Sequence, residues 1–167
     1  GVNGSAPHAL GVALDRLFFS ADAGQGDEPF VSDGTAAGTV QLADIDPAQG
    51  SRITGFVGAG PLCYFAAWDA AHGRELWCSD GTPAGTRMVA DLNPGVLGSS
   101  PSDLIAFGAE LAFVATSPTT GTELWLTDGT AANTRAIDLR PGSNGSTPQS
   151  VIVANGRLWF SAEGPSG

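Results

Sequence analysis

One short stretch decides the fold of this chain: Glu75-Leu76-Trp77, a cysteine, and then Ser79-Asp80-Gly81-Thr82-Pro83-Ala84-Gly85-Thr86. The second part of the stretch occurs three times. The other copies read Ser32-Asp33-Gly34-Thr35-Ala36-Ala37-Gly38-Thr39 and Thr127-Asp128-Gly129-Thr130-Ala131-Ala132-Asn133-Thr134. The three aspartates lie 47 and 48 residues apart, a period that is typical of repeat architectures.

Further landmarks keep the same register on both sides of these copies. Glu123-Leu124-Trp125 precedes the third copy, and Glu28-Pro29-Phe30 precedes the first. Each copy is followed by an aspartate (Asp44, Asp91 and Asp138), a proline and then a Gly-Ser pair (Gly50-Ser51, Gly98-Ser99 and Gly145-Ser146). One more pair, Gly4-Ser5, stands near the start. The chain therefore reads as a single repeat array over residues 1–167, with units at about 5–50, 51–98, 99–145 and a partial unit at about 146–167.

Apolar residues alternate with period two inside each unit, which is the pattern of half-buried strands. One stripe recurs as Leu17-Phe19-Ala21, Leu62-Tyr64-Ala66, Leu111-Phe113-Ala115 and Leu158-Phe160-Ala162. In the third unit we predict strands at about 103–107, 110–116, 123–127 and 134–139, and in the partial unit at about 151–154 and 157–162. No segment shows capped helical periodicity, so essentially no helix is expected.

Four antiparallel strands in about 47 residues is the size of a propeller blade. The predicted fold is all-β: a β-propeller-type array of four-stranded antiparallel blades, with about three and a half repeats. Closed propellers typically use about 4–8 blades, so this chain is not expected to close a ring alone. We expect either further blades of the same precursor or partner protein chains to cover both ends. Two copies would not complete each other's fourth blade, because each offers the same first two strands.

The Glu-Leu-Trp and Asp-Gly-Thr landmarks together resemble the ELWxxDGT repeat family of bacterial, largely secreted, multi-repeat proteins. The resemblance covers nearly the whole chain. It implies a propeller-like fold and a secreted or cell-surface location, and it implies no assigned reaction. The first unit departs from the pattern at Pro29 and Phe30, and the third departs at Asn133.

The charge balance excludes some classes of partner. Only 7 Lys and Arg stand against 17 Asp and Glu, for a net charge of −10. Such a surface repels nucleic-acid phosphates and anionic membranes, so we expect no nucleic-acid binding. No apolar run approaches the roughly 20 residues that span a bilayer, so membrane insertion is not expected either.

The repeated carboxylates have two interpretations. Asp33, Asp80 and Asp128 are predicted to accept hydrogen bonds inside Asp-Gly-Thr turns, and the alternative is a cation such as Ca²⁺. Calcium needs about 6–8 oxygen ligands, whereas each hairpin offers one such carboxylate, so the turn interpretation is preferred and no cofactor is predicted. The aspartates that follow each copy (Asp44, Asp91 and Asp138) are expected to tie one blade to the next.

The aromatic residues divide into two groups. Trp77 and Trp125 belong to the structural repeat together with Glu75 and Glu123, and they are predicted to pack inside or between blades. Stacking on sugar rings is the alternative for an exposed tryptophan. The candidates for ligand contacts are residues outside the repeated stripe or in matching loops: Trp68, Trp159, Asp22 and Asp69.

The two cysteines lie on neighbouring strands of the second unit. A hairpin centred between Ala70 and Ala71 would place Cys63 directly opposite Cys78, within reach of a disulfide. The same scheme pairs Phe18 with Val31 and Ala112 with Leu126, so a buried apolar pair is the alternative.

Nothing in the sequence indicates an enzyme. The only histidines, His8 and His72, occupy no repeated position, and no nucleophile or phosphate-binding motif is present. The sequence favours a non-catalytic, secreted repeat protein for ligand recognition, adhesion or assembly, with glycans among the candidate ligands. The rival interpretation is a scaffold subunit that packs against partner chains, and a hydrolase with a propeller fold comes third.

Overall fold

A computed structural model describes residues 4–22, 24 and 26–164 of the chain. Within these ranges the fold consists of antiparallel sheets and one three-residue 3₁₀ helix, η1 (Ala131–Asn133). The prediction of an all-β fold with essentially no helix is confirmed for these residues. The outermost residues of the predicted array, 1–3 and 165–167, lie outside the described residues.

Four successive sheets correspond to the four sequence units. Sheet 1 contains β1 (His8–Ala13), β2 (Arg16–Asp22), β3 (Asp27–Ser32) and β4 (Val40–Gln41). Sheet 2 contains β5 (Thr54–Ala59), β6 (Leu62–Asp69), β7 (Gly73–Ser79) and β8 (Arg87–Met88). Sheet 3 contains β9 (Ser102–Phe107), β10 (Glu110–Ser117), β11 (Gly121–Thr127) and β12 (Arg135–Ile137). Sheet 4 has only β13 (Gln149–Ala154) and β14 (Arg157–Ser161).

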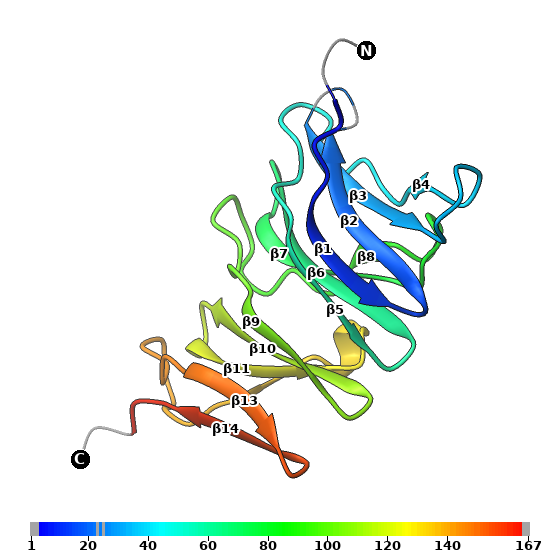
Figure 1. The fold of residues 1–167 in the computed structure, drawn as a ribbon. Helices are drawn as coiled ribbons and strands as arrows, with labels where there is room; N and C mark the ends of the chain where they lie inside the picture. Colours follow the sequence, from blue (N-terminus) through cyan, green and yellow to red (C-terminus); the bar gives the residue numbers. More distant parts are fainter. Residues whose placement is uncertain (1–3, 23, 25, 165–167) are drawn as a thin grey trace.

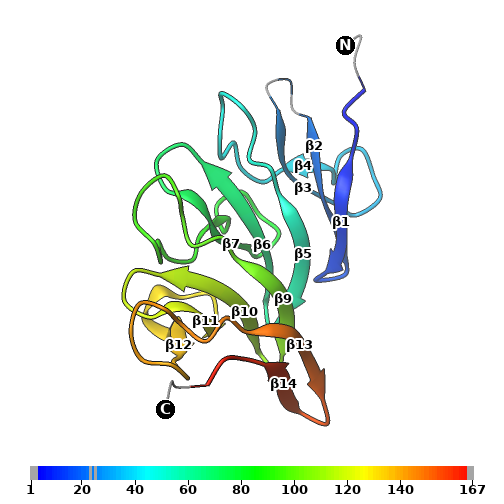
Figure 2. The same ribbon diagram turned by 90° about the vertical axis from the view of Figure 1, so that its left-hand side faces the viewer.

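The sheets follow one another along an open arc, with the first sheet and the last at its two ends (Figure 1). Their first strands form the line of contact, because β1 lies against β5, β5 against β9, and β9 against β13. The view turned by 90° shows the same succession, with sheet 1 and sheet 4 at opposite ends (Figure 2). The arrangement is thus propeller-type without a closed ring.

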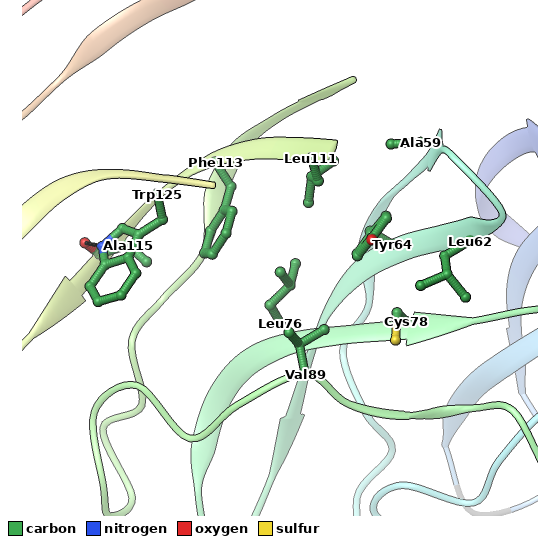
Figure 3. Close-up of a cluster of buried hydrophobic side chains, with 10 residues drawn as sticks. All are labelled: Ala59, Leu62, Tyr64, Leu76, Cys78, Val89, Leu111, Phe113, Ala115 and Trp125. Atoms are coloured by element: carbon green, nitrogen blue, oxygen red, sulfur yellow. Dashed lines mark hydrogen bonds between the residues drawn. The ribbon is translucent and has the colours of Figure 1, made fainter. Parts of the chain in front are cut away.

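Apolar side chains fill the spaces between neighbouring sheets. Phe18 and Val31 of sheet 1 pack against Cys63 and Phe65 of sheet 2. A second cluster joins sheets 2 and 3, where Tyr64 of β6 lies in the same cluster as residues of β10 and β11 (Figure 3). Burying a large apolar side chain of this kind contributes about 1.5–3 kcal/mol, so these clusters hold the array together.

The register of the second hairpin differs from the prediction. The predicted pairs Phe18–Val31 and Ala112–Leu126 are confirmed, but Cys63 pairs with Ser79, and Tyr64 pairs with Cys78. Asp69 pairs with Gly73, so three residues form the loop, and its centre lies at Ala71 rather than between Ala70 and Ala71. Gly73 supplies the positive φ of 70° that such a short loop needs.

This shift by one residue separates the two cysteines, because adjacent positions of a strand face opposite sides of the sheet. Cys63 belongs to the cluster between sheets 1 and 2, whereas Cys78 belongs to the cluster between sheets 2 and 3. Both are buried free thiols in the described part of the chain, so the predicted disulfide is wrong. The repeated stripe in this sheet is likewise Cys63-Phe65-Ala67 rather than Leu62-Tyr64-Ala66.

Thiol counting tests this separation. Unfolding the chain in denaturant without reductant is expected to expose two reactive thiols per molecule. In the native protein both should react slowly, because burial raises the pKa of Cys63 to about 12 and also raises the pKa of Cys78. Finding no reactive thiol in the unfolded, unreduced chain would contradict the register described here.

Candidate functional site

The three Asp-Gly-Thr segments form turns that are closed by their own side chains. Asp80 Oδ1 accepts hydrogen bonds from the Thr82 backbone N–H at 2.9 Å and from Thr82 Oγ1 at 2.7 Å. The Asp33 and Asp128 turns repeat both bonds. In all three, the hydrogen bond from the threonine hydroxyl lowers the pKa of the aspartate. The local geometry is therefore the predicted turn.

A second pair of hydroxyls fixes the same turns, and sequence reasoning missed it. Ser79 Oγ lies 2.7 Å from Thr86 Oγ1, and it accepts a hydrogen bond from the Gly81 N–H at 3.0 Å. The other copies make the same contacts with Ser32 and Thr127. The signal was present in the sequence, since a Ser or Thr stands at both of these positions in every copy.

Removing divalent cations tests whether these turns depend on metal. No group of three or more His, Cys, Asp or Glu side chains in the described residues could hold a metal ion. Because each aspartate is already bonded to its own turn, EDTA is expected to leave the Tm of the chain unchanged. A fall of many degrees on chelation, reversed by Ca²⁺, would contradict this expectation.

Buried glutamates, rather than the predicted aspartates, connect one unit to the next. Glu75 is fully buried and accepts hydrogen bonds from the Ser99 N–H at 2.8 Å, the Ser99 hydroxyl and the Asn93 N–H at 3.3 Å. Glu123 binds the N–H and the hydroxyl of Ser146 in the same way. Glu28 accepts from the backbone N–H groups of Ile45 and Asp46. Asp44, Asp91 and Asp138 are exposed, so the tie that was predicted for them belongs to the glutamates.

The Gly-Ser linkers are bonded to the sheets on both sides. The Ser99 carbonyl accepts a hydrogen bond from the Thr116 N–H of sheet 3 at 2.9 Å, while its side chain is held by Glu75 of sheet 2. The isolated pair near the start takes the same place before sheet 1, where the Ser5 carbonyl accepts from the Asp22 N–H at 2.8 Å. The linker serine is therefore the joint of the array.

The repeated tryptophans are packing residues, as predicted. Trp125 is buried, stacks on Phe113 with ring centroids 6.5 Å apart, and donates a hydrogen bond to the Ala115 carbonyl at 3.0 Å. Trp77 packs against the cluster between sheets 1 and 2. Phe30 takes this position in sheet 1 and stacks on Phe19 at 5.6 Å.

The ligand candidates from the sequence do not converge on one cleft. Asp22 lies in sheet 1, Trp68 and Asp69 lie in sheet 2, and Trp159 lies in sheet 4. Only Trp68 and Asp69 are neighbours. The guanidinium carbon of Arg52 lies 4.8 Å from the centroid of the Trp68 ring, so this half-buried indole carries a cation on one face.

The two loop aspartates hold their own hairpin loops. Asp22 accepts hydrogen bonds from the N–H groups of Gly24 and Gly26, and Asp69 accepts from those of Ala71 and His72. Asp69 also accepts a hydrogen bond from the His72 ring at 2.9 Å. Both carboxylates are thus engaged in loop structure, next to the exposed end of each hairpin.

The Asp69–His72 pair gives a pH-dependent prediction. The hydrogen bond that the His72 ring donates to Asp69 raises the pKa of His72 above its ordinary 6.5. A raised pKa in the folded state favours folding below the ordinary pKa, and this contribution is lost as the pH rises through the raised value. Asp69→Asn is therefore expected to lower the pKa of His72 in an NMR titration, and an unchanged titration would contradict the pairing.

In the described part of the chain, no helix is long and apolar enough to cross a lipid bilayer. The sequence matches no family model and no curated protein.

Two solved structures resemble the fold. One comes from work on two prolyl endopeptidases and the role of inter-domain dynamics in catalysis and specificity. It is 17% identical, with a TM-score of 0.53, and covers 96% of this chain and 20% of that one. The other is a puromycin hydrolase mutant complexed with PGG, which is 19% identical, with a TM-score of 0.56, and covers 93% of this chain and 25% of that one. At this identity the likeness shows that the fold is shared and nothing more.

Proposed function

We propose that this chain is a propeller segment with a non-catalytic role in ligand recognition, adhesion or assembly, with glycans as the ligand class. The repeated carboxylates support a non-catalytic role, because those of Asp80, Glu75 and their counterparts accept hydrogen bonds within turns and linkers. The sequence varies between units at the loop end of the hairpin that joins the second and third strands, where Asp22, Trp68 and Thr116 take the matching position. The resemblance to ELWxxDGT repeats supports a secreted or cell-surface location in a bacterium.

The observation that carries the proposal is the environment of Trp68. Trp68 takes the same place in sheet 2 that Asp22 takes in sheet 1 and Thr116 takes in sheet 3. In each case the backbone N–H donates a hydrogen bond to the carbonyl of the serine in the preceding Gly-Ser pair. Its indole is partly exposed and has the Arg52 guanidinium over its ring. An aromatic face next to a hydrogen-bonding charged group suits the apolar face and hydroxyls of a sugar ring.

Glycan-array binding tests the proposal. The wild-type chain is expected to bind a defined set of glycans, and Trp68→Ala is expected to weaken that binding at least about tenfold, which corresponds to about 1.4 kcal/mol. Thr116→Ala, at the matching place in sheet 3, serves as the control and should leave binding unchanged. No bound glycan, or equal binding by both variants, would contradict the assignment.

A second candidate is the propeller segment of a hydrolase, which the two structural neighbours favour. The chain spans only 20% and 25% of those chains. Cleavage of a prolyl peptide substrate by the protein that carries this segment would favour the hydrolase over the recognition role.

A further inference from the structure

Neighbouring sheets meet through a contact that uses the same strand positions twice. Arg16 Nη1 of β2 donates a hydrogen bond to the Gly81 carbonyl of sheet 2 at 3.2 Å. A Cβ atom on Gly81 would lie 3.8 Å from Cζ of Phe18, so the phenyl ring covers this glycine. At the same positions of sheet 2, Leu62 and Tyr64 cover Gly129 of sheet 3, where a Cβ would collide with both side chains. The Gly129 carbonyl accepts its hydrogen bond from Arg87 of β8 instead, at 3.0 Å. Both glycines are buried as a result.

The first sheet presents the receiving half of this contact with nothing in it. Gly34 is the counterpart of Gly81 and Gly129, yet it is exposed, and no atom lies within 4 Å of its Cβ position. Beside the Ser32–Thr39 turn lies a shallow apolar pocket of about 210 Å³, lined by Pro7, Leu10, Leu17, Phe19, Ser32 and Thr39. We call Gly34 and this pocket the socket.

The last sheet presents the donating half. Ala154 pairs with Arg157 as Ala13 pairs with Arg16. Trp159 follows Arg157 by two residues, as Phe18 follows Arg16. We call Arg157 and Trp159 the knob. Trp159 is 53% exposed, whereas Phe18 and Tyr64 in the matching positions are fully buried.

We propose that the knob of one copy of this chain docks into the socket of a second copy, head to tail. Within one chain the two halves lie at opposite ends of the arc and cannot meet (Figure 1). In both internal contacts the side chains that cover the glycine come from the second strand of a sheet, and β14 is such a strand. Covering the glycine therefore requires only β14 of sheet 4.

The chemistry of the two halves is complementary. Trp159 would cover Gly34 as Phe18 covers Gly81, with Leu10 and Leu17 beside the indole. Arg157 would donate to the Gly34 carbonyl of the second copy, next to its Asp33. Sheets 1 and 4 also expose apolar side chains, among them Leu10 (61%) and Ile152 (55%). This inference rests on the assembly role within the proposed function, and it names a second copy of this chain as the partner.

Sedimentation of two complementary variants tests the proposal. Wild-type chain is expected to exceed its monomer mass of 16.8 kDa as concentration rises. Trp159→Ser removes the knob and Leu10→Asp blocks the socket, so each variant alone should stay monomeric. Their equimolar mixture should form a 1:1 complex that stops at two chains, because one intact knob and one intact socket remain. Circular dichroism checks that both variants keep the wild-type fold.

Leu97→Ser is the matched control, because Leu97 is 81% exposed and lies outside the knob and the socket. It should associate like wild type. The proposal is overturned if wild-type chain stays monomeric, if the mixture fails to form the complex, or if Leu97→Ser abolishes association as well. A monomeric wild-type chain that still binds glycans would remove the self-association and leave the recognition role intact.

Discussion

Replacing Tyr64 by alanine is expected to lower the free energy of unfolding by about 3–5 kcal/mol, the range for large aromatic deletions in a core. Tyr64 is fully buried, and its ring fills the contact between sheets 2 and 3 above Gly129. Little else can move in to fill the space, because neighbouring positions on both strands are already packed. Urea unfolding followed by tryptophan fluorescence measures the change.

Two variants separate packing from other causes. Trp159→Ala removes an aromatic ring at the matching position of sheet 4, and because that ring is exposed the monomer should lose no more than about 0.5 kcal/mol. Tyr64→Phe removes a buried hydroxyl that has no hydrogen-bond partner among the described residues, so it should cost nothing or stabilise the chain. Equal losses for Tyr64→Ala and Trp159→Ala would contradict the burial described here.

Replacing Glu75 by alanine is expected to cost about 2–4 kcal/mol, because the amide and the hydroxyl of Ser99 would each lose a buried acceptor worth about 1–3 kcal/mol. The loss is expected at the junction of sheets 2 and 3, where hydrogen exchange of the Ser99 amide should rise most. Thermal and urea unfolding give the size of the effect.

Asp91→Ala is the matched control for this variant. Asp91 belongs to the same unit and also carries a carboxylate, but it is exposed, so its removal should change the free energy of unfolding by no more than about 0.5 kcal/mol. Glu75→Gln keeps one acceptor oxygen and should fall between the two. If Asp91→Ala destabilised the chain more than Glu75→Ala, the assignment of the tie to the glutamate would be wrong.

The repeat predicted the sheets well, because it reports directly on how the chain is divided. It failed on the register of the second hairpin. All residues from Leu62 to Ala67 are buried, so both faces of β6 are apolar and the alternation that normally selects a register is missing. The length of the loop then decides, and the three-residue loop closed by Gly73 could not be distinguished from a two-residue one by composition.

In the candidate site, contacts between residues close in sequence could be predicted, and contacts between distant residues could not. The Asp-Gly-Thr turns could be predicted because every partner of Asp80 lies within two residues of it. The tie from Glu75 to Ser99 could not, since the two residues are 24 positions apart and only the fold brings them together. Trp159 was singled out as exposed, but its match to Phe18 became visible only through the strand pairing.

The doubly bonded linker determines how the array comes apart. Opening one inner sheet breaks the bonds to its glutamate on one side and to its linker carbonyl on the other, so neighbouring sheets are coupled in their unfolding. Sheet 4 has only two strands in the described chain, and it is joined to sheet 3 by the contact of β13 with β9, by the Arg140–Glu163 ion pair and by Ser146, which Glu123 holds. Fraying should therefore begin there, and its loss would leave the three complete sheets as one cooperative unit.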